Sequence, residues 1–186
     1  MTVELISVGT EILMGNIVNS NTRFLAEKCA LLGFDMYYQV TVGDNYGRMK
    51  DVIETALKRS DLIILTGGLG PTEDDLTKEV CAAVMGMELV EDPHTRKHLE
   101  AFFVNNIYRE IPENNWKMAT VPKGALVLDN HNGMAPGLIL EREGKAAILL
   151  PGPPGELYPM FNDQVFPWLQ KRQQSVLVSR MVKICG

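Results

Sequence analysis

The stretch Leu62-Ile63-Ile64-Leu65-Thr66-Gly67-Gly68-Leu69-Gly70-Pro71 decides the fold of this chain. Its first half, Leu62–Thr66, is a short and almost continuously apolar run, which predicts a strand buried on both faces of a parallel sheet. A glycine-rich loop follows at once, and a helix is expected from about Glu73 to Met85. A buried strand, a glycine loop and a helix in succession are typical of an α/β domain.

The residues before this stretch repeat the strand–helix order twice. Strands are expected at Val3–Val8 and Met36–Val42, and helices at Asn21–Leu32 and Arg48–Lys58. Gly33 ends the first of these helices, as a glycine after the last helical turn commonly does. Three successive strand–helix units predict a mostly parallel sheet with right-handed crossovers.

The second half of the chain departs from this order. We expect a helix at Pro93–Val104 and then a polar loop or short helix at Asn105–Trp116. Three strands are expected at Ala125–Leu128, Gly137–Glu141 and Ala146–Leu150. A proline-rich turn (Pro151–Pro154), a last helix (Glu156–Lys171) and a final strand (Val176–Ile184) follow. The second and third of these strands form a hairpin around Arg142–Lys145. Pro167 lies deep inside the last helix, so a kink or an early end is expected near Val165.

Composition and charge restrict the function classes. The chain has 186 residues, of which 46% are hydrophobic and 22% charged, as in an ordinary globular domain. Its net charge of −5 and the lack of a basic stripe disfavour binding to nucleic acid or to anionic lipid. No apolar run approaches the roughly 20 residues of a membrane-spanning helix, and no signal peptide is evident. We therefore expect a cytoplasmic domain without a nucleic-acid or membrane partner.

Cysteine and histidine spacing gives no metal centre. Cys29, Cys81 and Cys185 are odd in number and far apart, which excludes a disulfide framework and a zinc site. Cys29 and Cys81 lie in apolar helical stretches, where we expect them to fill the core. His94 and His98 stand four residues apart, but no third ligand accompanies them, so surface positions are expected for both.

The loop Thr66–Asp75 is the strongest candidate for ligand binding. Glycines between a strand and a helix allow backbone N–H groups to close around an anion. The loop is not a P-loop, because no Gly-Lys-Ser/Thr follows, and Glu73 replaces the third glycine of the dinucleotide fingerprint. An alternative is a capped turn, with Thr72 and Asp75 as an ordinary capping box. Because Asp74 and Asp75 would repel a bare phosphate, the pattern favours a metal-bridged phosphate ester or anhydride.

Polar residues also follow the other predicted strands, and the tips of parallel strands meet at one edge of a sheet. Glu11 follows the first strand, so it either faces the aspartates of the glycine loop or is a solvated loop carboxylate. Asp44 follows the second strand and either joins this site or caps the next helix. Asn19 and Ser20 precede the first helix, and Ser20 is the expected cap.

Taken together, these motifs resemble the N-terminal domain of competence/damage-inducible protein A (CinA). The resemblance covers nearly the whole chain, in order, and rests on Gly9-Thr10-Glu11-Ile12-Leu13 with Gly15, Val42-Gly43-Asp44-Asn45, Thr66-Gly67-Gly68-Leu69-Gly70-Pro71-Thr72 with Asp74, Asp75 and Thr77, Ala135-Pro136-Gly137, and Leu150-Pro151-Gly152-Pro153-Pro154 with Glu156. That domain is similar to the molybdopterin-binding domains of molybdenum-cofactor biosynthesis. The resemblance implies a three-layer α/β/α fold with a mostly parallel sheet, to which the predicted hairpin adds antiparallel strands.

The resemblance also implies chemistry. Domains of the CinA type are linked to divalent-metal-dependent hydrolysis of ADP-ribose to AMP and ribose 5-phosphate, which is the expected function. One alternative is a molybdopterin-binding domain that does not hydrolyse free nucleotides, and another is a regulatory fragment whose pocket no longer turns over. Mg²⁺ or Co²⁺ is the expected cofactor, with K⁺ as a further candidate. Relatives form dimers or trimers, so a homo-oligomer is expected.

The resemblance assigns site residues position by position. Asp44 and Asp75 match the acidic pair of the small pterin-binding relatives, and Asp74 and Glu11 match positions of the CinA type. The expected catalytic residues are Glu11, Asp44, Asp74 and Asp75, and the expected metal ligands are Glu11, Asp74 and Asp75. The expected substrate-binding residues are Asn21, Gly67, Gly68, Gly70, Thr72, Gly152 and Pro153, with the N–H groups of the three loop glycines around the diphosphate.

The expected domain covers residues 1–172, and residues 173–186 are expected to begin a following segment that is cut short. Full-length CinA proteins usually continue into a nicotinamide-nucleotide deamidase domain. That activity is not assigned to this chain.

Overall fold

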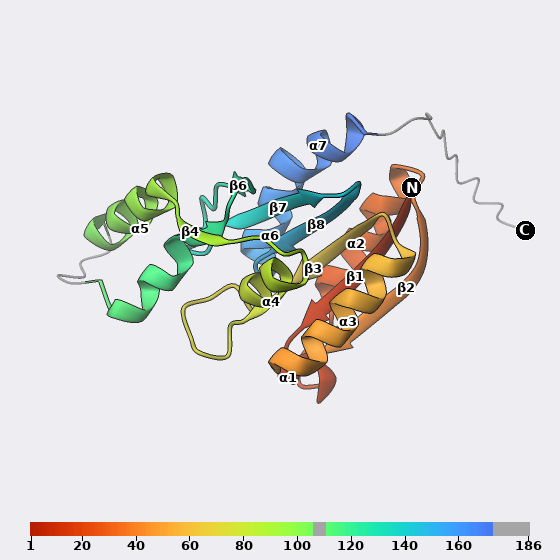
Figure 1. Cartoon of the computed structure of the whole chain (residues 1–186), viewed down its shortest axis with the longest axis horizontal. Helices are drawn as coiled ribbons and strands as arrows, with labels where there is room; N and C mark the ends of the chain where they lie inside the picture. Colours follow the sequence, from red (N-terminus) through yellow and green to blue (C-terminus); the bar gives the residue numbers. More distant parts are fainter. Residues whose placement is uncertain (106–110, 173–186) are drawn as a thin grey trace, which may run out of the picture.

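One six-stranded sheet forms the centre of the structure (Figure 1). The computed structural model describes residues 1–105 and 111–172. The strands of this sheet are β1 (Thr2–Val8), β2 (Asp35–Val42), β3 (Leu62–Thr66), β6 (Leu126–Leu128), β7 (Gly137–Arg142) and β8 (Lys145–Leu150). They lie in the order β2-β1-β3-β8-β7-β6, in which the first four are parallel and β7 pairs antiparallel with both β8 and β6. The predicted mostly parallel sheet with an antiparallel hairpin is confirmed.

Helices cover both faces of this sheet. The α-helices of the described residues are α1 (Thr10–Leu13), α2 (Ser20–Leu31), α3 (Tyr46–Arg59), α4 (Thr77–Val84), α5 (Pro93–Asn105), α6 (Pro154–Met160) and α7 (Phe166–Gln170), and α5 lies away from the main sheet (Figure 1). Buried residues of α3 and α4 belong to one core cluster, whereas those of α2, α6 and α7 belong to a second cluster. Since the two clusters lie on opposite faces of the strands, the expected three-layer α/β/α arrangement is confirmed.

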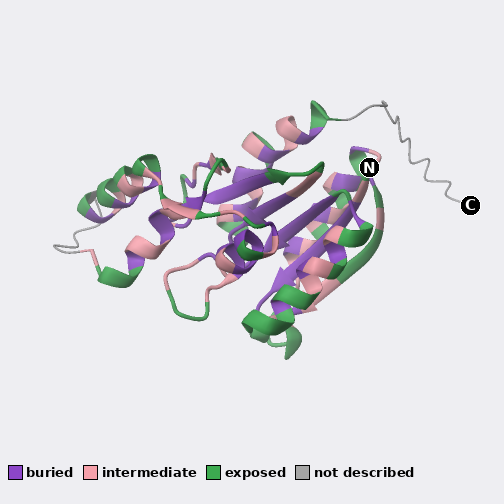
Figure 2. Ribbon diagram, viewed as in Figure 1, coloured by how far each residue is buried: buried purple, intermediate pink, exposed green. Residues whose placement is uncertain are grey.

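The side chains of β3 show why its apolar run forms a central strand. Ile63 and Leu65 join the cluster with α3 and α4, and Leu62 and Ile64 join the other cluster, as the two-residue period of a strand requires. All four side chains are at most 1% exposed. Burial of such an aliphatic side chain contributes about 1.5–3 kcal/mol. Figure 2 shows the same contrast for the whole sheet, with buried central strands and exposed outer faces of the helices.

The helix after β3 begins later than predicted. The sequence predicted a helix from about Glu73, but α4 starts at Thr77. The N–H of Thr77 donates to the carbonyl oxygen of Gly68 at 3.1 Å, and its hydroxyl donates to that of Gly67 at 2.8 Å. These bonds tie the first helical residue to the start of the glycine loop, so residues 73–76 belong to the loop.

The last helix is interrupted, as its prolines predict. α6 is followed by one π-helical turn, η2 (Phe161–Val165), and then by α7. Pro167 cannot donate a backbone hydrogen bond, and the π turn directly before it accommodates this loss. The expected irregularity near Val165 is therefore confirmed. The predicted strand Val176–Ile184 and Cys185 lie outside the described residues.

A smaller unit extends from the sheet. β4 (Leu89–Glu91) pairs antiparallel with β5 (Thr120–Pro122), and α5 and the 3₁₀ helix η1 (Glu113–Ala119) lie beside this pair, on the left of Figure 1. We call residues 89–105 and 111–122 the arm. The sequence predicted α5 and a short helix or loop before Trp116, but the two strands are too short to display a strand pattern.

The structure also bears on the cysteines and on the expected lack of a membrane-spanning helix. Cys29 and Cys81 are buried, and burial raises the pKa of each thiol to about 12, so both act as inert core residues as predicted. Within residues 1–105 and 111–172, no helix has the length and apolar character needed to cross a bilayer.

Candidate functional site

The carboxyl ends of the parallel strands surround a cavity of about 650 Å³. Loops that follow β1, β2, β3 and β8 line it, which is where ligands bind in open α/β sheets. Every residue that the sequence predicted for the site lines this cavity: Glu11, Asn21, Asp44, Gly67, Gly68, Gly70, Thr72, Asp74, Asp75, Gly152 and Pro153. The structure therefore brings the predicted set together, although several members have tasks that the sequence did not reveal.

Gly67 anchors the glycine loop to the sheet. Its φ is +101°, and a Cβ atom there would lie 2.2 Å from the carbonyl oxygen of Val8, so only glycine fits. Its N–H donates to the carbonyl oxygen of Leu150 at 3.0 Å. This corrects the expected role of Gly67, because an N–H that is bonded to β8 cannot also hold a diphosphate.

The next three residues present free backbone donors. Within the described residues, the N–H groups of Gly68, Leu69 and Gly70 make no hydrogen bond, although Leu69 is buried and all three line the cavity. Native proteins rarely leave consecutive donors unpaired, because each lost bond is costly. A run of such N–H groups at a cavity wall is an anion-binding arrangement.

The first turn of α2 also faces the cavity. Asn19, Ser20 and Asn21 all line the cavity, and α2 is 12 residues long, so the positive end of its dipole faces the ligand space. The cap of this helix is Asn19, whose Oδ1 accepts from the N–H of Thr22 at 3.2 Å. The prediction that Ser20 is the cap is therefore wrong, since the helix begins one residue earlier than its apolar pattern indicated.

Asn21 joins three walls of the cavity. Its Nδ2 donates to the Thr66 hydroxyl at 3.0 Å and to the carbonyl oxygen of Gly152 at 2.6 Å. The Thr66 hydroxyl in turn donates to the carbonyl oxygen of Pro151 at 3.0 Å. These bonds hold α2, the end of β3 and the proline turn after β8 at fixed spacing.

The carboxylate of Asp75 closes a tight turn. Its Oδ2 accepts from the N–H of Thr72 at 3.0 Å and from the Thr72 hydroxyl at 2.5 Å. The alternative of a capping box is wrong, because α4 starts only at Thr77 and the turn lies wholly within the loop. No described residue contacts the other oxygen of Asp75 by a hydrogen bond, so it remains free for a ligand.

Asp44 holds the loop after β1 instead of capping α3. Its Oδ2 accepts from the N–H and from the hydroxyl of Thr10, both at 2.9 Å. The cap of α3 is Asn45, whose Oδ1 accepts from the N–H of Arg48 at 3.1 Å. Asp44 therefore links the tips of β1 and β2 and keeps one oxygen at the cavity.

Glu156 is a pocket carboxylate that the sequence reading did not assign to the site. It lines the cavity from α6, and its Oε2 accepts from Nδ2 of Asn130 at 2.7 Å. A Cβ atom on Gly133 would lie 2.3 Å from this carboxylate, so the 129–136 loop packs closely on it. The signal that could have found Glu156 is its place in the first turn after the Pro151–Pro154 motif.

The cavity is strongly acidic. Five carboxylates line it, those of Glu11, Asp44, Asp74, Asp75 and Glu156, and no Lys, Arg or His of the described residues does. In residues 1–105 and 111–172, no three acidic, His or Cys side chains approach closely enough to hold a metal ion. Glu11, Asp74 and Asp75 share the cavity but do not form a ready-made metal centre. A resident metal ion held by the protein alone does not fit this arrangement.

Apolar side chains also line the cavity. Ile12, Ile17 and Val18 line it from the α1–α2 segment, and Met118 and Met134 from the arm and the β6–β7 loop. A cavity that offers backbone donors together with aliphatic and thioether groups suits a ligand with a phosphate and a flat ring.

Neither His94 nor His98 lines the cavity. His94 is exposed, as predicted, and pairs with Asp129 at 2.6 Å, which raises the pKa of the imidazole through the hydrogen bond. His98 is partly buried rather than fully on the surface, because its Nε2 lies 3.2 Å from the carbonyl oxygen of Gly133.

The comparisons with known proteins agree with this geometry. Residues 4–171 match the family described as "Probable molybdopterin binding domain". The chain belongs to this molybdopterin-binding domain family. A protein from Thermus thermophilus titled as the molybdopterin biosynthesis enzyme MoaB has the same fold, with a TM-score of 0.57 at 17% identity, covering 91% of this chain and 96% of that one.

Relatives with higher sequence identity to this chain carry the name that its motifs predicted. A "Putative competence-damage inducible protein" of Caldicellulosiruptor bescii is 52% identical over all of this chain and 45% of its own length. Its namesake in Clostridium beijerinckii is 50% identical over the same shares. The chain thus spans about half the length of these curated relatives. A crystal structure of the protein CinA of unknown function from Thermoplasma acidophilum has a TM-score of 0.81 and 32% identity, covering 87% of this chain and 95% of that one.

Proposed function

We propose that this domain binds a small phosphorylated heterocycle of the molybdopterin or nucleotide type. The observation that carries the proposal is the run of three unpaired N–H groups, Gly68 to Gly70, at the wall of the cavity. A phosphate oxygen would satisfy these donors, and the first turn of α2 would add to the favourable potential. The apolar residues Ile12, Ile17 and Val18 would contact the ring of the ligand.

The charge of the cavity determines the form in which the ligand binds. Five carboxylates and no basic side chain among the described lining residues would repel a bare di- or monophosphate. The ligand would therefore enter as a complex with a divalent cation, Mg²⁺ or Co²⁺, with K⁺ as an additional counter-ion. Mg²⁺ commonly binds through one or two carboxylates together with substrate phosphates, so a free oxygen of Asp75 or Asp44 would be sufficient.

A second candidate function is hydrolysis of ADP-ribose. The observation in its favour is that Asp74 and the free oxygen of Asp75 lie at the same cavity as the unpaired N–H groups. In this reaction a water oxygen would bond to one phosphorus of the diphosphate while the bridging P–O bond breaks. A carboxylate would take the proton of the water, and AMP and ribose 5-phosphate would leave.

Two assays separate the candidates. The first measures release of AMP from ADP-ribose with MgCl₂, CoCl₂ or EDTA, with and without KCl, and the second measures calorimetric binding of a phosphorylated pterin and of ADP-ribose. Asp75→Asn is the matched variant, because an amide oxygen can still accept from Thr72 while the charge is lost. Metal-dependent AMP release that Asp75→Asn abolishes, at an almost unchanged melting temperature, supports the hydrolase. Pterin binding without AMP release supports the binding domain, and a large loss of stability in Asp75→Asn would mean that Asp75 is structural.

We also propose that the chain assembles into a dimer or a trimer and acts in the cytoplasm without a nucleic-acid partner. Its acidic net charge of −5 is consistent with the absence of polyanionic partners. Light scattering of the purified protein tests the assembly, and a mass equal to that of one chain would contradict it.

A further inference from the structure

The second half of the glycine loop has few attachments of its own. Residues 71–76 contain no helix or strand, and Thr72, Glu73 and Asp74 are exposed. The internal hydrogen bonds of this segment are the turn contacts between Thr72 and Asp75. The turn has its shape from these contacts, but they do not hold it in position relative to the cavity.

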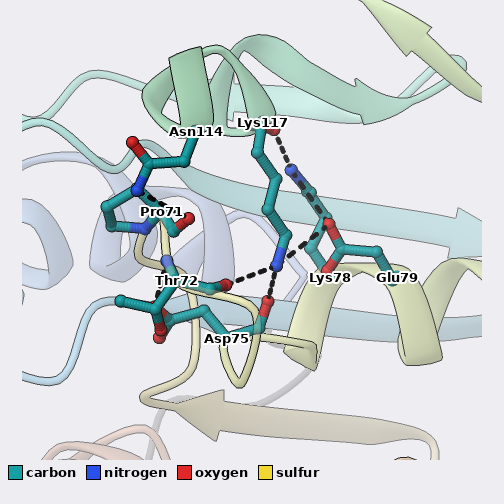
Figure 3. A network of polar contacts seen from close by, with 7 residues as sticks. All are labelled: Pro71, Thr72, Asp75, Lys78, Glu79, Asn114 and Lys117. Atoms are coloured by element: carbon teal, nitrogen blue, oxygen red, sulfur yellow. Dashed lines mark hydrogen bonds and ion pairs between the residues drawn. The ribbon is translucent and has the colours of Figure 1, made fainter. Parts of the chain in front are cut away.

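Leu76, at the end of this segment, packs against the core, and the contacts that fix the turn before it come from η1 of the arm. Nζ of Lys117 donates to the carbonyl oxygen of Thr72 at 2.9 Å and, by a shorter contact, to that of Asp75. Nδ2 of Asn114 lies 3.4 Å from the carbonyl oxygen of Pro71. Figure 3 shows the Lys117 side chain reaching from η1 to the turn, so a residue more than 40 positions away holds the loop.

The ammonium group of Lys117 makes two hydrogen bonds to the turn and one ion pair. The ion-pair partner is Oε1 of Glu79 on α4, at 3.9 Å. Lys78 reinforces the arrangement, because its buried Nζ donates to the carbonyl oxygen of Lys117 at 2.6 Å and lies 3.5 Å from Glu79. The two lysines and one glutamate together carry a net positive charge, and none of the three lines the cavity.

We propose that Lys117 is a positioning residue, which holds the Thr72–Asp75 turn so that the carboxylates of Asp74 and Asp75 face the ligand. Lys117 does not line the cavity, so it acts through the turn and not by contact with the ligand. Its effect on ligand binding rests on the proposed function, whereas its effect on the turn does not. The arm thereby becomes part of the binding apparatus, although it lies outside the main sheet.

The test compares Lys117→Met, which removes the charge and the donors, with Lys117→Arg, which keeps both. Lys123→Met is the control, because Lys123 is an exposed residue of the same region that only pairs with Glu88 at 3.7 Å. Hydrogen exchange of the ligand-free protein is followed in the peptide covering residues 69–76. We expect exchange there to rise about tenfold or more in Lys117→Met, to change little in Lys117→Arg, and to be unchanged in the control.

Affinity for ADP-ribose with MgCl₂ is then measured by calorimetry for the same variants. We expect a loss of about tenfold or more in Lys117→Met and a loss of less than about threefold in Lys117→Arg, at similar melting temperatures. Unchanged exchange of residues 69–76 in Lys117→Met would show that Lys117 does not hold the turn, and altered exchange with unchanged affinity would overturn its positioning role. If the wild-type protein binds neither ADP-ribose nor a phosphorylated pterin, the proposed function fails, while the exchange data still decide whether Lys117 holds the turn.

Discussion

The two halves of the glycine loop are held in different ways. Residues 67–70 are anchored by backbone hydrogen bonds to β8 and α4. Gly67 packs so closely against the backbone of β1 that a Cβ atom would not fit. In residues 71–76, Leu76 packs against the core, but the Thr72–Asp75 turn is held mainly by side chains, from Asp75 within the segment and from Lys117 in the arm. The first half is thus a rigid part of the sheet edge, whereas the second can change position when a few side-chain contacts change.

This difference separates two tasks. The unpaired N–H groups of Gly68, Leu69 and Gly70 belong to the rigid half, which suits an anion site whose geometry must be set before the ligand arrives. The carboxylates Asp74 and Asp75 belong to the adjustable half, which suits groups that meet a cation carried by the ligand. Single substitutions can test this division between a rigid and an adjustable half.

The largest effect is expected for Gly67→Ala. Its new Cβ atom would lie 2.2 Å from the carbonyl oxygen of Val8, at a φ of +101°, so the free energy of unfolding should fall by about 3 kcal/mol or more. Gly144→Ala is the control, because its φ is +76° but no atom lies within 4 Å of the added carbon. It should lose only about 1–2 kcal/mol. Urea denaturation of both variants measures the difference, and equal losses would mean that close packing against β1 is unimportant.

A smaller effect is expected for Asn21→Ala, which removes the bonds that join α2, β3 and the proline turn. The unfolding free energy should fall by about 1–3 kcal/mol, because the hydroxyl of Thr66 and the carbonyl of Gly152 lose a donor. Hydrogen exchange should rise at residues 150–153 and remain unchanged at residues 71–76. A change at residues 71–76 as well would show that this segment is not independent of the walls that Asn21 joins.

Gly70 is the last residue of the first half, but a side chain there would meet Asp75 of the second half, so Gly70→Ala should cost less than about 1 kcal/mol of stability. The added carbon would lie 2.6 Å from Oδ2 of Asp75, and the end of a side chain can move where a backbone atom cannot. The variant should nevertheless displace Asp75 from Thr72, so ligand affinity should fall more than stability does. Calorimetry beside thermal unfolding measures both, and a stability loss as large as that of Gly67→Ala would contradict the division.

The smallest effect concerns the arm, through the pair of His94 and Asp129. The hydrogen bond that His94 donates to Asp129 raises the pKa of His94 in the folded protein, so the pair stabilises below the unfolded pKa of about 6.5 and loses this contribution as pH rises through the higher folded value. Because the His94 side chain is 66% exposed, its contribution should be about 0.5 kcal/mol or less. His94→Gln should therefore lower the unfolding free energy slightly at pH 5.5 and not at pH 8.5. An equal loss at both pH values would mean that the charge is irrelevant.

The sequence was sufficient for the parts that local pattern determines. The apolar run of β3 and the glycines after it predicted a buried strand and a loop at the sheet edge, and strand-tip residues such as Asp44 and Glu11 do line the cavity. This succeeded because the carboxyl ends of parallel strands necessarily meet at one edge.

Most of the predictions that were wrong concern residues whose partners are distant in the chain. The N–H of Gly67 is taken by Leu150, and the turn at Thr72–Asp75 is held by Lys117, and neither partner is visible from local spacing. Asn19 and Asn45 cap helices for which Ser20 and Asp44 were considered, since adjacent polar residues compete for the same N–H groups. The strands β4 and β5 are stable only as a pair and have no signature alone.

The most direct test of the central claim is a titration of ¹⁵N-labelled protein with ADP-ribose and MgCl₂, followed by ¹H–¹⁵N NMR. The amide signals of Gly68, Leu69 and Gly70 should move together and saturate, whereas that of Gly67, bonded to Leu150, and that of the remote Gly144 should stay in place. The same experiment with a phosphorylated pterin extends the test to the other ligand type. If either ligand binds saturably and leaves the signals of Gly68–Gly70 unchanged, these N–H groups do not form the anion site.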